Sequence, residues 1–112
     1  MSDTSGQEAL GELLKYRDTV RELLKKRREL VEDLERQIGA IQMQLREVSV
    51  QRLVRSGDAQ RVLEGNRRRS ILAETLQKLN KQMTEARGEQ DRAEERLRDV
   101  DSELQELQGV TE

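Results

Sequence analysis

Hydrophobic residues recur every three or four positions along most of the chain. In the second half the series runs without a slip, and Gln90 is its only polar member. Alternating steps of three and four make a seven-residue repeat, the pattern of α-helices in a left-handed coiled coil. A charged disordered chain has no reason to keep this frame. The second-half positions, which we call its seam, are Leu72, Leu76, Leu79, Met83, Ala86, Gln90, Ala93, Leu97, Val100, Leu104 and Leu107.

The first half carries a seam in the same repeat. We letter its heptads a to g with Val31 at position a, so that hydrophobic residues alternate between a and d. Extended towards the N-terminus, the frame also places Arg17 and Arg27 among the hydrophobic residues. The seam of this half is Leu10, Leu13, Arg17, Val20, Leu24, Arg27, Val31, Leu34, Ile38, Ile41, Leu45 and Val48.

The two seams are out of phase with each other. Continued past Val48, the first frame puts Val62 and Leu76 at d, whereas the second frame puts both at a. One uninterrupted helix would therefore need a stutter between the two seams. A turn explains the same break without strain.

The strongest turn signal in the chain is Ser56-Gly57-Asp58, and Gly65-Asn66 is the second. A reversal near Gly57 pairs the seams along their whole length, with facing residue numbers that add up to about 113 or 114. A turn at Gly65-Asn66 would leave part of the first seam unpaired. We therefore predict an antiparallel helical hairpin that turns at Gly57. The alternative is a parallel dimer of one long helix.

The expected fold class is all-α, with two long helices in coiled-coil packing. Ser5 and Glu8 have the spacing of a capping box, and Gly109 follows the second seam where a left-handed cap would lie. Four Glu-to-Lys/Arg pairs have the favourable i, i+4 order: Glu22–Lys26, Glu32–Arg36, Glu74–Lys78 and Glu94–Arg98. The expected segments are a disordered tail 1–6, helix 7–55, turn 56–58, helix 59–108 with a possible irregularity at 65–66, and a tail 109–112.

Three leucines widen the hydrophobic face of the first helix. Leu23 and Leu30 lie at g positions on one flank of the seam, and Leu14 lies on the other flank. The facing residues 83–93 are mostly small, which leaves room for another helix. Single leucines on a surface need no partner, but three in one segment favour docking. We expect self-association into a four-helix bundle, or docking of a partner helix around residues 13–31.

Charge is unevenly placed, although the net charge is only −2. Residues 85–112 carry four arginines and ten acids, whereas residues 52–69 carry six arginines and two acids. The predicted turn end is therefore basic and suits an acidic protein surface, anionic lipid or phosphate; plain solvation of a loop is the alternative. Arg67–Arg69 also make Ser70 a candidate for basophilic kinases. This basic tip comprises Arg52, Arg55, Arg61, Arg67, Arg68 and Arg69.

Composition argues against several classes of function. The chain has no His and no Cys, which excludes imidazole or thiolate metal sites, disulfides and Cys/His nucleophile pairs. Tyr16 is the only aromatic residue, so no platform for stacked bases exists, and specific nucleic-acid binding is not expected. We see no glycine-rich phosphate loop, no cofactor site and no apolar run long enough for a membrane span. Residues 1–9 lack signal-peptide features, so an intracellular, cytoplasmic location is the default expectation.

Residues 22–31 (ELLKKRRELV) resemble the opening helix of all-helical chorismate mutases. That resemblance implies a small helical enzyme with Arg and Lys around a dicarboxylate inside a dimer. In outline the chain is also similar to type III and flagellar export stalk proteins and to prefoldin subunits. A prefoldin-like chain would carry strands at Val48-Ser49-Val50 and Arg61-Val62-Leu63. These are likenesses of architecture, and the leading expectation is a non-enzymatic coiled-coil interaction or scaffold protein.

Overall fold

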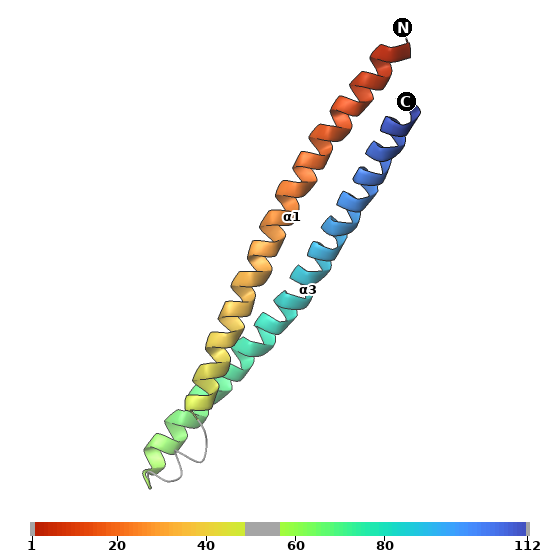
Figure 1. Ribbon diagram of the computed structural model, residues 1–112. Coiled ribbons are helices and arrows are strands. Elements are labelled where there is room, and N and C mark those ends of the chain that lie inside the picture. The colour runs from red at the N-terminus through yellow and green to blue at the C-terminus, as the bar shows by residue number, and fades with distance from the viewer. Residues whose placement is uncertain (1, 49–56, 112) are drawn as a thin grey trace. The chain divides into compact units, whose positions relative to one another are not determined.

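Two long α-helices make up the computed structural model, which describes residues 2–48 and 57–111 (Figure 1). Helix α1 spans Ser2–Glu47 and helix α3 spans Ala59–Thr111. The described residues contain no strand. The two helices pack against each other, so the all-α helical hairpin predicted from the heptads is confirmed.

The hairpin consists of two compact units, and each takes one segment from each helix. One unit combines residues 2–30 of α1 with residues 86–111 of α3. The other lies within residues 31–85 and combines the end of α1 with the start of α3. In both units the earlier part of one helix meets the later part of the other. The helices are therefore antiparallel within one molecule, which rules out the single extended helix.

The predicted seams form the contact between the helices. Every seam residue of both halves is buried or half-buried. Among the described residues no polar or charged residue is buried, and no side chain is completely shielded from solvent. The core is thus a single row along each helix, as expected when each helix buries only one face. The buried seam residues are Val20, Leu24, Val31, Leu34, Val48, Leu72, Leu79, Met83, Ala86, Ala93, Val100 and Leu104.

The turn signal at Gly57 is confirmed by the backbone. Gly57 lies outside both helices with φ +69°, a conformation that costs a side-chain-bearing residue free energy. Asp58 then caps α3: its Oδ1 accepts a hydrogen bond from the Gln60 amide at 3.0 Å, and its carbonyl accepts one from Val62 at 3.1 Å. A side-chain oxygen on the second amide of a helix is the usual N-cap arrangement.

The helix bounds differ from those expected in the first half. Helix α1 begins at Ser2 rather than near residue 7, so the expected capping-box positions Ser5 and Glu8 lie inside the helix and do not mark its start. It ends at Glu47, and the expected continuation to residue 55 meets a turn at Val48 and then residues 49–56, which lie outside the described residues. Residues 2–6 are therefore helical and not a tail.

Helix α3 is more regular than expected. It runs through Gly65-Asn66 without a break and continues past residue 108 to Thr111. Gly109 stays in the helix and does not take the left-handed conformation of a cap; Gly57 alone has a positive φ among the described residues. The prefoldin-like strand at Arg61-Val62-Leu63 is wrong, since these residues are helical. Over its described length, neither helix contains a stretch apolar enough to cross a membrane.

Candidate interaction surfaces

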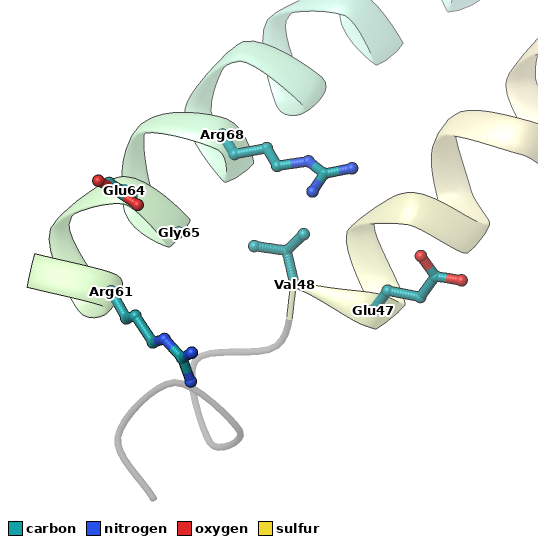
Figure 2. A pocket seen from close by; sticks show the side chains of 6 residues that line it. All are labelled: Glu47, Val48, Arg61, Glu64, Gly65 and Arg68. Carbon is teal, nitrogen blue, oxygen red and sulfur yellow. The ribbon is translucent and has the colours of Figure 1, made fainter. Parts of the chain in front are cut away.

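Val48 is an aliphatic side chain that packs against α3. Arg61, Glu64, Gly65 and Arg68 follow one another at the i, i+3, i+4, i+7 spacing and surround a hollow on the helix surface. Figure 2 shows Val48, the residue directly after the end of α1, pointing at this hollow, between Arg61 and Arg68 and opposite Gly65. Four residues at this spacing around one side chain are the hole of knobs-into-holes packing. Val48 and Gly65 are both buried, and their numbers add up to 113, as the predicted register requires.

A row of large apolar side chains runs along α1 beside the seam. Tyr16, Leu23 and Leu30 are seven residues apart, so they share one flank of the helix. Leu23 is half-buried, whereas Tyr16 is 47% and Leu30 is 41% exposed. We call these three residues the α1 row. The predicted Leu14 is half-buried and lies off this row. Tyr16 was not among the predicted interaction residues, although it lies one heptad before Leu23 and this spacing indicates a place on the same flank.

The α1 row also borders a shallow hollow. Its corners Thr19, Glu22, Leu23 and Lys26 have the same spacing as the hole that receives Val48. In this hollow no side chain of the described residues plays the part of Val48, since every lining residue comes from α1 itself. Asp18 completes the lining, so the surroundings carry both signs of charge.

Two ion pairs join α1 to α3 next to the α1 row. Arg27 pairs with Glu89, and Arg28 Nη2 lies 3.5 Å from Glu94 Oε1. Both arginines belong to the stretch that resembles the chorismate mutase helix. In the described molecule their charges are held by carboxylates of the same chain.

Arg17 is different from these paired arginines. It occupies a seam position and is half-buried, and its Nε atom is shielded from solvent with no hydrogen-bond partner. A buried donor without a partner costs free energy. Arg17 is therefore a weak point of the seam.

Four of the six arginines of the predicted basic tip belong to the described residues. Arg52 and Arg55 lie outside the described residues, while Arg61, Arg67, Arg68 and Arg69 are exposed on α3. Consecutive residues point in different directions around a helix, so Arg67, Arg68 and Arg69 diverge. Arg61 and Arg68 flank the hollow that receives Val48, but Arg67 borders a different one. Among the described residues none of these four arginines has an ion-pair partner within 4.0 Å.

The hollow beside Arg67 lies on the outward face of α3. Its most exposed apolar members are Leu63 at 64% and Ile71 at 63%. Neither was predicted from the sequence, because both lie off the seam and the residues between them on this face are polar. Ser70, the candidate phosphorylation site, lies in the lining and is exposed. We call this set the outer hollow; its lining residues are Leu63, Asn66, Arg67, Ser70 and Ile71.

Comparison with known proteins gives no relative. No protein-family model, no curated protein and no solved structure matches the chain. A functional assignment therefore depends on the surfaces described above.

Proposed function

We propose that this chain is a non-enzymatic coiled-coil interaction protein. It associates with a second copy of itself, or with partner helices, through the flank of α1, and it offers arginines near the turn to an acidic partner. The observation that carries the proposal is the α1 row, Tyr16, Leu23 and Leu30, at heptad spacing outside the seam.

A heptad row outside the seam suits a further helix. In a helical bundle each helix shows hydrophobic residues to more than one neighbour, so the flanks of the seam become apolar. The α3 residues buried in the same unit include Ala86 and Ala93. Alanines bury less apolar surface than leucines, so this unit gains less from its own seam and more from an added helix.

The charges beside the α1 row favour self-association within this proposal. Lys26 and Glu22 lie around the hollow at Leu23, together with Asp18. A surface that carries both signs is able to match a second copy of itself, with acids facing bases. A four-helix bundle of two hairpins is the simplest assembly that covers such a row.

Sedimentation equilibrium of the full chain tests the proposal. We expect a mass of at least twice the 13.0 kDa of the monomer at high micromolar concentration. The double variant Leu23→Glu/Leu30→Glu places carboxylates on the α1 row and should return the mass to that of the monomer. The matched control is Met43→Glu, on α1 but off the row and 62% exposed, which should leave the mass unchanged. Circular dichroism verifies that each variant stays helical.

Two sedimentation results would contradict the proposal. A wild-type chain that stays at 13.0 kDa at high micromolar concentration refutes self-association. A mass that falls equally with Met43→Glu would show association through some other surface, and the α1 row would then lose its role.

A further inference from the structure

We infer that the outer hollow of α3 binds an acidic amphipathic helix of a partner protein, which inserts an aliphatic side chain between Leu63 and Ile71 and places a carboxylate on Arg67. This inference rests on the proposed function, since it specifies the acidic partner and the surface that receives it.

The geometry of the hollow is that of an empty hole. Leu63, Asn66, Arg67 and Ser70 have the i, i+3, i+4, i+7 spacing, which is also the spacing of the four α3 residues that surround Val48. On one face of α3 the aliphatic side chain of Val48 points at such a hollow, whereas the lining of the outer hollow comes from α3 alone. A helix with an exposed Leu, Ile or Val is the matching partner.

The apolar rim gives such a helix a place to bury surface. Leu63 and Ile71 are each more than three-fifths exposed, so a docked helix would cover most of both side chains. They are eight residues apart, about 12 Å at 1.5 Å per residue. Two turns of a partner helix span this length.

Arg67 determines the charge of the partner. In the hollow beside Val48 the corner at position i+4 is Gly65, whereas in the outer hollow that corner is Arg67. An uncharged helix laid over Arg67 would remove water from a guanidinium that has no carboxylate partner in the described molecule, at a high cost in free energy. A carboxylate one turn from the inserted side chain removes that cost through a charge-assisted hydrogen bond.

The charged residues around the outer hollow also favour an acidic partner. Residues 59–71 of α3 contain four arginines and one glutamate, a net charge of +3. This field attracts an acidic helix and repels a basic one. A membrane surface fits less well, because Asn66 and Ser70 separate the two apolar side chains, and membrane-bound helices need a continuous apolar face.

The test uses the full chain and a designed probe. The probe is a fluorescein-labelled helical peptide of about three heptads, with one leucine per heptad and glutamates three and four residues from each leucine. Fluorescence anisotropy measures its binding. A second peptide has lysine at every glutamate position, and vesicles of phosphatidylserine and phosphatidylcholine serve as the lipid probe.

Two variants and two matched controls locate the site. Leu63→Ala and Arg67→Glu should each weaken binding of the acidic peptide about tenfold or more. Met43→Ala removes an equally exposed side chain from α1, and Lys81→Glu reverses a charge two heptads further along α3. Both controls should change the affinity less than about twofold. All four residues are exposed, so the variants keep the fold.

Three results would overturn the inference: equal affinity for the glutamate and lysine peptides, equal losses with Arg67→Glu and Lys81→Glu, or binding to vesicles but not to the acidic peptide. If the wild-type chain self-associates through the α1 row but does not bind the acidic peptide, this inference is refuted and the proposed function stands. A monomeric chain that binds the peptide would instead remove self-association and leave the outer hollow in place.

Discussion

Replacing Gly57 by alanine tests the hairpin itself. Gly57 has φ +69°, where an L-residue with a Cβ pays about 1–2 kcal/mol. Beyond the two chain neighbours, a Cβ built at this position meets no atom within 4 Å, so no contact with the rest of the described molecule adds to the cost. We therefore expect Gly57→Ala to lower the free energy of unfolding by about 1–2 kcal/mol.

Replacing a glycine inside a helix by alanine should have the opposite effect and raise the free energy of unfolding. Gly11 and Gly39 lie within α1, and beyond the nearby backbone of the helix itself a Cβ at either position also meets no atom within 4 Å. Alanine is favoured over glycine in a helix by about 1 kcal/mol, so Gly11→Ala and Gly39→Ala should each stabilise the protein by about that amount. Together with the loss at Gly57, the difference between Gly57→Ala and Gly39→Ala is about 2–3 kcal/mol.

Urea unfolding followed by far-ultraviolet circular dichroism measures these differences. All variants are compared at one protein concentration, because association makes apparent stability depend on concentration. With a slope of about 1–3 kcal/mol per molar urea, the midpoints of Gly57→Ala and Gly39→Ala should differ by roughly 1 M or more. Gly57→Asn is the internal control, since asparagine tolerates the left-handed region better than alanine does. If Gly57→Ala stabilises the chain as much as Gly39→Ala, residue 57 is helical and the hairpin is refuted.

Further predictions concern single side chains and use the same urea assay. Leu104→Ala removes a side chain that is 4% exposed and should cost about 2–5 kcal/mol, whereas Leu63→Ala on the surface should stay within about 0.5 kcal/mol; equal effects would contradict the assigned core. Arg17→Leu removes the unpartnered Nε and should stabilise by about 1 kcal/mol, and a loss of stability would show that Arg17 has a partner. Glu89→Gln breaks a pair whose side chains are both more than a third exposed, so the cost should be below about 1 kcal/mol and should vanish in high salt.

The seam was predictable because helix geometry leaves few alternatives. A seven-residue repeat of hydrophobic residues has to place them on one face, and the half-burial of Arg17 and Arg27 follows from the same frame. The turn was predictable for a related reason, since Gly57 takes a conformation that other residues avoid. The seam and the turn both follow from backbone geometry, and residues close together in the sequence determine each of them.

The bounds of the helices were harder to predict, because small energies decide them. Gly65 costs a helix about 1 kcal/mol, which made Gly65-Asn66 look like a turn. In the structure Gly65 is buried opposite Val48, and packing across the hairpin offsets that cost. This contact joins residues far apart in sequence, so the local signal at Gly65 was misleading.

Side-chain partners were the least predictable feature. The sequence favours the pairs Glu94–Arg98 and Glu32–Arg36. In the structure Glu94 instead pairs with Arg28 across the hairpin. Arg36 pairs with Asp33, with 3.6 Å between Nη2 and Oδ1. Local pairs of this kind differ by only about 0.2–0.5 kcal/mol. Any neighbour that tertiary packing brings within reach is therefore able to replace the expected partner.

The α1 row and the outer hollow should act independently of each other. They belong to different helices and to different compact units, and the first is mixed in charge while the second is basic. Changes at sites that share no partner add in free energy. Arg67→Glu should therefore leave the sedimenting mass at the wild-type value, and Leu23→Glu should leave the affinity for the acidic peptide unchanged. A variant that weakened both would mean that one surface serves both contacts, with the second copy of the chain as the acidic helix.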